Sequence, residues 1–174
     1  MNEIIQAILN RRSCRAFAER SVPEQDVTQI LECALAAPSG MGRRTWKFTA
    51  VTDQRKIQKL AKEVGRALSR GEDYDMYRPA VLILTSNEKD SPYREVDNAC
   101  AMENIYLAAN ALGLGCVWIN QLLKVFDEPG VRAVLDELHI PQNHGIYGCA
   151  AIGYPKEGFQ PSEKKTRGTA EVIS

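Results

Sequence analysis

The sequence predicts one α+β domain, and three observations support this prediction. Its length of 174 residues suits a single domain, and 44% of the residues are hydrophobic, which is enough to build a core. Segments with the apolar spacing of helices alternate with short runs that have the pattern of strands. No linker, repeat or low-complexity stretch interrupts them. We therefore expect residues 1–174 to form one folded unit.

The first part of the chain is predicted to form two helices with a basic segment between them. A helix over Asn2–Asn10 carries large apolar residues on one face and leads into the basic segment Arg11–Arg15. A second helix is expected to begin near Pro23, which suits a first helical turn, and to end before Pro38-Ser39-Gly40. The basic segment and the glycine-containing segment therefore both lie at helix ends.

The middle of the chain is predicted to hold two strands around a helix. Trp46–Thr52 has the pattern of a strand, and Asp53 can cap a following helix with a single apolar stripe. That stripe consists of Ile57, Leu60, Ala61, Val64 and Leu68. The run Ala80–Leu84 is continuously apolar and too short for a helix, which indicates an interior strand.

The helix predicted over Val96–Leu112 is apolar almost all round. Such a helix must be covered on most sides, and one small domain can hardly bury it alone. Gly113-Leu114-Gly115 ends it. A strand over Cys116–Ile119, a helix over Val131–Leu138 and a strand over Ile146–Ile152 follow.

Composition excludes several classes of function. Lysine plus arginine equals aspartate plus glutamate at 22 each, so no overall field attracts nucleic acid or anionic lipid. No apolar run approaches the roughly twenty residues of a membrane span. At the N-terminus the apolar residues precede the basic ones, which is the reverse of a secretory signal, so we expect a cytoplasmic protein without nucleic-acid or membrane partners.

Cysteine and histidine content argues against a metal centre. The five cysteines are widely spaced without a CxxC pair, which favours reduced thiols over a disulfide framework or a zinc site. The two histidines, His139 and His144, lie in one turn-like stretch, where a structural or surface role is the simpler interpretation. We therefore expect no metal.

Four segments resemble the motifs of the nitroreductase family of flavoproteins. Residues 11–17, RRSCRAF, resemble the family's RRSxRxF opening, and APSG at 37–40 followed by WKF at 46–48 resembles its APS segment and W-x-F strand. GLGCVWI at 113–119 and IGYP at 152–155 resemble its GLG turn and its closing motif. The segments occur in the family's order, span nearly the whole chain and are followed by a Lys-x-Arg pair.

The resemblance implies a nitroreductase-like fold. Its features are a mixed, mostly antiparallel sheet flanked by helices on both faces and an intertwined homodimer with two FMN sites between the chains. Val96–Leu112 would form the dimer interface. Residues 154–174, which by composition alone could be a frayed tail, would form a C-terminal extension that wraps the partner subunit.

The basic segment is the predicted phosphate site. Three arginines and a hydroxyl within five residues suit a phosphate monoester, although a solvated basic turn is the alternative on charge alone. By resemblance, Arg11 and Ser13 bind the FMN phosphate and ribityl chain, Arg12 flanks them, and Arg15 reaches toward the pyrimidine edge of the ring. A fixed cation there would favour the reduced, negatively charged flavin.

The resemblance assigns the other flavin contacts to three segments. Pro38-Ser39-Gly40 would line the flavin from the opposite protomer, although a helix stop and turn is the simpler interpretation. The segment after the Cys116–Ile119 strand would face the ring near N5. The residues concerned are Lys165 and Arg167 at the phosphate, Pro38, Ser39 and Gly40 on the ring, and Ile119 and Asn120 near N5.

The activity implied is an FMN-dependent oxidoreductase of ping-pong mechanism. NADH or NADPH would deliver hydride to flavin N5, and a small electron-poor acceptor, nitroaromatic or quinone-like, would then take the electrons. No catalytic side chain is required, since the flavin carries the chemistry. Two alternatives stay open: another flavin reaction, such as reductive dehalogenation or flavin breakdown, and a flavin-binding module without turnover.

Some positions depart from the family pattern. Gly42 and Arg44 stand where many relatives carry amides, and Asn120 stands where some carry glutamate. The segment Gly65–Arg78 is too short for the helical insertion of longer members, so a more open pocket is expected. Its candidate lining residues are Tyr74, Met76 and Tyr77, for which plain packing is the alternative.

Overall fold

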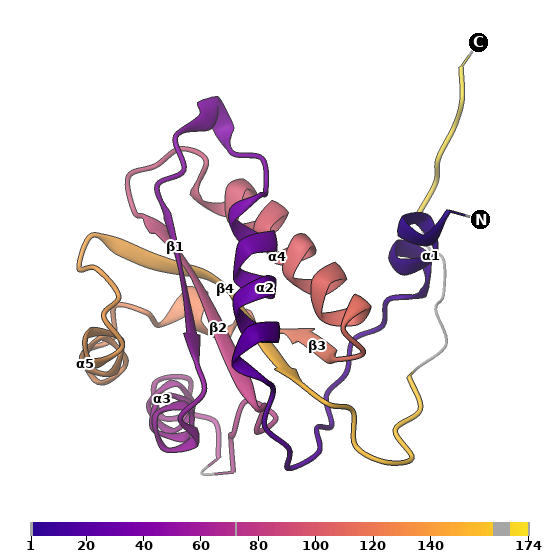
Figure 1. Cartoon of the computed structure of the whole chain (residues 1–174). Helices are drawn as coiled ribbons and strands as arrows, with labels where there is room; N and C mark the ends of the chain where they lie inside the picture. Colours follow the sequence, from indigo (N-terminus) through magenta and orange to yellow (C-terminus); the bar gives the residue numbers. More distant parts are fainter. Residues whose placement is uncertain (1, 72, 162–167, 174) are drawn as a thin grey trace.

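The fold is built on a four-stranded antiparallel sheet. The computed structural model describes residues 2–71, 73–161 and 168–173 (Figure 1). The strands are β1 (Trp46–Val51), β2 (Val81–Glu88), β3 (Gly115–Trp118) and β4 (His144–Gly153), in the order β1-β2-β4-β3. Each neighbouring pair is antiparallel, and parallel pairing among the described residues is confined to an isolated bridge between Ser13 and Cys116. The α+β class and the predicted strands are confirmed.

Helices cover both faces of the sheet, as expected. On one face lie α2 (Glu24–Leu35) and α4 (Arg94–Ala111), and on the other lie α3 (Gln54–Ala67) and α5 (Pro129–Glu137) (Figure 1). The first helix, α1 (Glu3–Asn10), stands beside the sheet and contacts α4. Two short 3₁₀ helices, η1 (Gly40–Gly42) and η2 (Gln121–Lys124), follow α2 and β3.

The sheet separates two hydrophobic cores. Leu82 and Leu84 of β2 pack in the core under α3 and α5, whereas Val81 and Ile83 pack in the core under α2 and α4. Successive side chains of a strand point to opposite faces, so a strand covered on both faces must be apolar at every position. This explains the continuous apolar run that predicted the strand.

Strand β2 continues further than its apolar run. Thr85, Ser86 and Asn87 are completely buried and pair with both β1 and β4. Their side chains find partners inside the fold; for example, the Thr85 hydroxyl donates to the Gly148 carbonyl at 2.9 Å. Hydropathy alone ends the strand at Leu84, because buried polar residues whose partners lie on other segments leave no apolar pattern.

Side-chain caps begin two of the helices, and the one at Asp53 was predicted. The Asn2 side chain accepts a hydrogen bond from the Ile4 N–H at 2.9 Å. The Asp53 carboxylate accepts one from the Arg55 N–H at 2.8 Å. These bonds satisfy amide groups that a helix N-terminus leaves without a partner, and so they fix where α1 and α3 begin.

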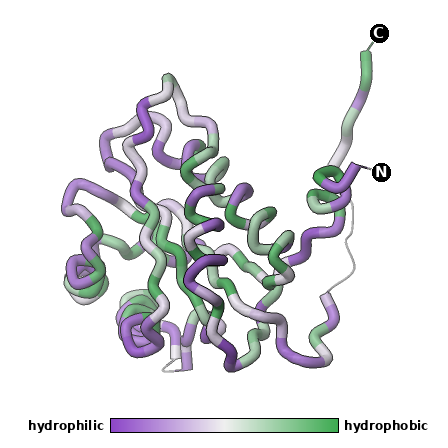
Figure 2. Tube along the Cα trace, in the orientation of Figure 1, coloured by the Kyte–Doolittle hydropathy of each residue, from purple (hydrophilic) through white to green (hydrophobic). Residues whose placement is uncertain are grey.

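Helices α1 and α4 leave apolar surface uncovered in the single chain. No residue of α1 is buried, and its apolar face is 45–68% exposed at Ile4, Ile5, Ile8 and Leu9 (Figure 2). Val96 of α4 is 59% exposed. Apolar residues gathered in this way are typical of an interaction surface. Within the described residues, no helix combines the length and the hydrophobicity needed to cross a membrane.

Candidate functional site

The basic segment 11–15 is held against β3, the edge strand of the sheet. Ser13 forms a parallel bridge with Cys116, and the Cys14 N–H donates to the Cys116 carbonyl at 3.0 Å. The Cys14 side chain is buried against Gly115, where an added Cβ would lie 2.5 Å from the Cys14 Cβ. Only glycine permits this close approach. The segment is therefore fixed by backbone bonds and close packing.

Arg11 is oriented by an aromatic side chain of α4. Its Cζ lies 4.9 Å from the centroid of the Tyr106 ring, and Tyr106 is 6% exposed. Burial raises the pKa of the Tyr106 hydroxyl, so the ring stays neutral at physiological pH. Arg11 has no carboxylate partner among the described residues. Its charge is thus positioned by stacking and left available to an anion.

The other two arginines of the segment differ in their surroundings. Arg12 donates through Nη1 to the Leu9 and Arg11 carbonyls, both at 2.9 Å, which caps the end of α1. Arg15 is exposed and forms no hydrogen bond, ion pair or ring contact with the part of the chain that the structure describes. Arg15 therefore keeps its cation free for a ligand, whereas Arg12 uses part of its donor capacity on the backbone.

The segment Pro38–Gly40 lies at the other end of α4 (Figure 1). The Gly40 N–H donates to the Asp97 carboxylate at 2.8 Å, whereas Arg11 stacks on Tyr106. Asp97 and Tyr106 are nine residues apart in α4, or about 14 Å along its axis. One chain thus holds the two predicted halves of the flavin site apart.

The segment after β3 bears on two predicted contacts. Ile119 is 1% exposed, and its N–H donates to the Cys149 carbonyl at 2.8 Å. Its backbone donor is therefore used within the sheet, which continues to the end of the predicted strand Cys116–Ile119. The contact of Ile119 near N5 stays a prediction. Asn120 is exposed and precedes η2, and its predicted contact stays open.

Trp118 is a candidate that the sequence reasoning did not single out. It is half-buried at the end of β3, with its indole beside Gly148. Its Nε1–H is buried and has no hydrogen-bond acceptor among the described residues. Buried hydrogen-bond donors are almost always paired, so a bound ligand is a candidate acceptor for this N–H. In the sequence, the position of this tryptophan at the end of a short predicted strand could have marked it as a candidate.

The C-terminal extension begins beside the basic segment. Pro155 forms an antiparallel bridge with Phe17, and the Lys156 N–H donates to the Ala16 carbonyl at 3.0 Å. The start of the predicted extension therefore pairs with its own chain. Lys165 and Arg167 lie outside the described residues.

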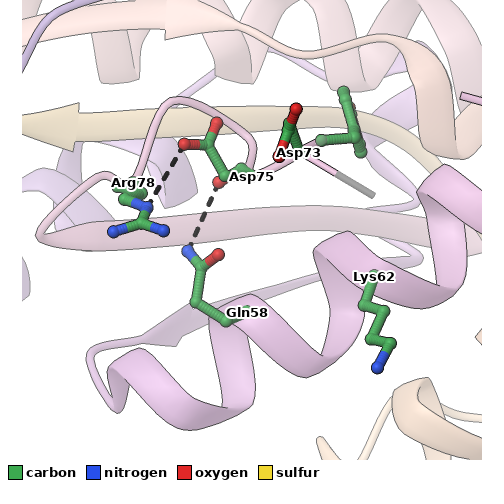
Figure 3. A pocket seen from close by; sticks show the side chains of 6 residues that line it. Gln58, Lys62, Asp73, Asp75 and Arg78 are labelled. Carbon is green, nitrogen blue, oxygen red and sulfur yellow. Dashed lines mark hydrogen bonds and ion pairs between the residues drawn. The ribbon is translucent and has the colours of Figure 1, made fainter. Parts of the chain in front are cut away.

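A polar cavity lies away from the basic segment. It has a volume of about 470 Å³ and lies beside α3 (Figure 3). Asp75 accepts from the Gln58 amide through its carbonyl and from the Arg78 Nε through its carboxylate, both at 3.3 Å. The lining residues are Gln58, Lys62, Asp73, Tyr74, Asp75 and Arg78.

The three residues predicted to line a pocket lie in different surroundings. Tyr74 lines the cavity beside α3, Met76 is 1% exposed in the core, and Tyr77 is 40% exposed. The interpretation of Met76 as a pocket residue is wrong, because it packs under α3 and α5. Helix α3 lies by β1, whereas the basic segment lies by β3 at the opposite edge of the sheet. The cavity is therefore separate from the basic segment in the single chain.

Nucleophiles and metal ligands are not assembled in the described residues. All five cysteines are free, and no group of three potential metal-ligating side chains is found there. Burial raises the pKa of the Cys14 and Cys116 thiols, which keeps them protonated. The His144 Nδ1 lies 3.1 Å from the Ser86 Oγ, but Ser86 is completely buried and out of reach of a substrate. The structural role expected for His144 fits this position.

Comparisons with known proteins match the whole of this architecture. The nitroreductase family model matches residues 8–154. A crystal structure of a nitroreductase with bound FMN from Bacteroides fragilis is 38% identical, covers 100% of both chains and superposes with a TM-score of 0.94. A protein of Archaeoglobus fulgidus, provisionally named NADH dehydrogenase/NAD(P)H nitroreductase, is 30% identical over 90% of this chain and 88% of its own. An iodotyrosine deiodinase from Thermotoga neapolitana is 25% identical over 84% of this chain and 86% of its own.

Proposed function

The chain belongs to the nitroreductase family, and we propose that it is an FMN-dependent oxidoreductase that uses NADH or NADPH to reduce a small electron-poor acceptor. The observation that carries this proposal is the basic segment on the edge strand β3. It presents the oriented cation of Arg11 and the free cation of Arg15. A relative of 38% identity and full-length coverage has FMN bound.

The donor set of this segment fits the phosphate of FMN. A phosphate monoester carries nearly two negative charges at neutral pH and accepts several hydrogen bonds. Arg11 is preoriented by Tyr106, so little side-chain entropy is lost when it binds an anion. Ser13 supplies a hydroxyl beside it, and Lys165 and Arg167 are proposed to complete the phosphate site.

The side chains bind and orient, and they do not form bonds to the substrate. When bound, FMN supplies the capacity to accept a hydride from a nicotinamide and to pass electrons on. Arg15 would stabilise negative charge at the pyrimidine edge of the ring, and Trp118 and Asn120 would contact the ring from the end of β3. The nicotinamide leaves before the acceptor enters, in a ping-pong sequence.

The active unit in this proposal is a homodimer. The exposed apolar face of α1 and the exposed Val96 of α4 need cover. Pro38–Gly40 would then serve the flavin of the partner chain. The two halves of the site are far apart along α4 within one chain, which fits a site shared between two.

A second reaction has support of its own. A relative of 25% identity is named iodotyrosine deiodinase, so a halogenated aromatic is a reasonable alternative acceptor. Gly42 and Arg44 also change the polarity of the loop after Pro38–Gly40. Arg44 is exposed and would add positive charge near an anionic phenolate acceptor.

Anaerobic turnover distinguishes these possibilities. Purified protein is expected to be yellow, to release FMN on denaturation, and to oxidise NADH or NADPH when a nitroaromatic or a quinone is added. An iodophenol as the acceptor tests the second reaction. Colourless protein that FMN does not reconstitute would overturn the proposal. Bound FMN that no nicotinamide reduces would leave a flavin-binding module without turnover.

A further inference from the structure

The start of α4 contacts the segment Pro38–Gly40 through a hydrogen bond from Gly40 to Asp97 and through packing of Gly40 against Tyr93. We propose that Asp97 is a positioning residue, which holds this segment in the conformation that contacts flavin. The inference rests on the proposed function, because it assigns a purpose to a contact within the same site. Four features of the described residues support it.

The first feature is a charge-assisted hydrogen bond to the loop backbone. The Gly40 N–H donates to the Asp97 Oδ1 at 2.8 Å, and Asp97 is 3% exposed. A carboxylate accepting from an amide in a buried setting is stronger than a neutral pair. The bond joins residues far apart in sequence, so it fixes the loop relative to α4.

The second feature is contact between Gly40 and an aromatic ring. A Cβ added to Gly40 would lie 2.3 Å from the Cγ of Tyr93 and 2.6 Å from both Cδ atoms. Gly40 therefore packs so closely against the Tyr93 ring that a side chain at this position would overlap the ring. Tyr93 and Asp97 are joined by a backbone hydrogen bond of 2.8 Å, so one turn of helix supplies both contacts.

The third feature is an unfavourable backbone in the residues that follow. Met41 has φ 55°, Gly42 has φ 66° and Arg44 has φ 50°. Non-glycine residues in the left-handed region are unfavourable and persist only where the surroundings enforce them. Within the loop, the Gly42 N–H donates to the Ser39 carbonyl at 3.0 Å and the Arg44 N–H donates to the Ser39 Oγ at 3.2 Å. These bonds close on the loop itself, and the contacts with α4 add support from outside it.

The fourth feature is the cost of the carboxylate itself. The Oδ2 of Asp97 is buried and has no hydrogen-bond partner among the described residues. A packing role alone would be met by an apolar or amide side chain without this penalty. The N-terminal end of α4 offsets part of the cost by favouring negative charge. The carboxylate adds a charge-assisted hydrogen bond to the Gly40 N–H.

Hydrogen exchange and proteolysis test the hold on the loop without reference to flavin. Asp97→Ala is expected to speed exchange of the Gly40 amide by at least about tenfold, since a hydrogen bond to a charged group contributes about 1.5–3 kcal/mol. Trypsin cleavage after the exposed Arg43 and Arg44 should speed up in parallel. Asp97→Asn keeps an acceptor oxygen but loses the charge, so it should restore the protection only in part.

Asn104→Ala is the matched control. Asn104 lies on the same helix, and its Nδ2 donates to the Cys33 carbonyl at 2.8 Å. Its loss should lower the melting temperature, as Asp97→Ala does, while leaving exchange at Gly40 and cleavage at Arg43 unchanged. Equal loosening of the loop in Asn104→Ala would overturn the assignment, because the effect would then be general destabilisation.

Flavin binding tests the positioning role itself. Asp97→Ala is expected to raise the dissociation constant of FMN by about tenfold or more. It should also alter the visible circular dichroism of the bound flavin, and Asp97→Asn should restore both only in part. Normal FMN affinity and an unchanged spectrum in Asp97→Ala would overturn the inference alone. Absence of FMN binding by the wild-type protein would instead overturn the proposed function, and the exchange result would still report on the hold.

Discussion

The guanidinium of Arg11 lies over the ring of Tyr106, with Cζ 4.9 Å from the ring centroid. The contact joins the basic segment beside β3 to α4, and the Tyr106 ring is almost completely buried. Arg11 is thereby set apart from Arg12, whose Nη1 donates to two backbone carbonyls. The two adjacent arginines should behave differently on substitution.

Arg11→Ala is expected to weaken FMN binding by about 10–100-fold, because a charge-assisted bond to phosphate is lost. Arg12→Ala should change the affinity by less than about threefold and should instead lower the stability of α1. Fluorescence titration with FMN measures the first effect, and circular dichroism during heating measures the second. Equal losses of affinity in both variants would contradict the distinction drawn between them.

Arg15→Ala is expected to lower the midpoint potential of the flavin by about 20–45 mV, equivalent to about 1–2 kcal/mol for a two-electron couple. The reason is that a cation near the pyrimidine edge stabilises the anionic reduced ring. Arg15→Lys keeps the charge and serves as the control. Potentiometry of the two variants checks the assignment, and an unshifted potential in Arg15→Ala would place Arg15 away from the ring.

Stability should fall as the pH drops below the ordinary range of histidine titration. Burial lowers the pKa of His144, with Lys47 and Arg132 adding to the effect and Glu88 opposing it. In the unfolded chain His144 takes up a proton near pH 6.5, whereas in the folded chain it does so only at lower pH. The free energy of unfolding is therefore highest above pH 6.5, and it decreases as the pH falls from there through the lowered pKa. Urea unfolding between pH 7.5 and 5 measures the slope.

His144→Gln removes the titrating group and should flatten this dependence, at the cost of the contact with Ser86. Substitution of the exposed His139 should leave the slope unchanged. A slope that persists in His144→Gln would assign the pH dependence to other groups.

The sequence predicted the strands, the helices and the basic segment because each depends on local pattern. It missed the polar end of β2, since Thr85, Ser86 and Asn87 are buried polar residues whose partners lie on other segments. Asp97 and Tyr106 also escaped notice, because their partners Gly40 and Arg11 are distant in sequence. Contacts between residues that are distant in the sequence produce no periodic pattern from which they could be predicted.

Ile119 depends on a long-range pair in the same way. The family motif predicts a flavin contact for it, and in the single chain its N–H extends the sheet to Cys149. Whether a residue at the end of a strand pairs or is free depends on the neighbouring strand, and β4 lies far along the chain.

The C-terminal extension is expected to serve both the phosphate and the dimer. Pairing of Pro155 with Phe17 shows that a deletion should begin after this contact, so removal of residues 162–174 is the appropriate truncation. It should weaken FMN binding and dimerisation together. The double variant Lys165→Ala with Arg167→Ala should weaken FMN alone, by about 1.5–3 kcal/mol for each charge-assisted bond.

Flavin titration beside analytical ultracentrifugation separates the two effects. Full FMN affinity in a monomeric truncated protein would contradict the wrapped-arm account. A truncated dimer with normal affinity would leave the last residues without a role in either.

The central claim is that one flavin site combines the basic segment of one chain with Pro38–Gly40 of the other, and mixed dimers test it most directly. Arg11→Ala and Gly40→Val, in which a side chain is forced against Tyr93, are co-expressed with different tags and purified as the heterodimer. If the halves come from different chains, one site carries both lesions and the other none. The heterodimer should then bind about one FMN tightly and keep about half of the wild-type NAD(P)H oxidation. A heterodimer with no more flavin or activity than the two parent variants would contradict the shared site.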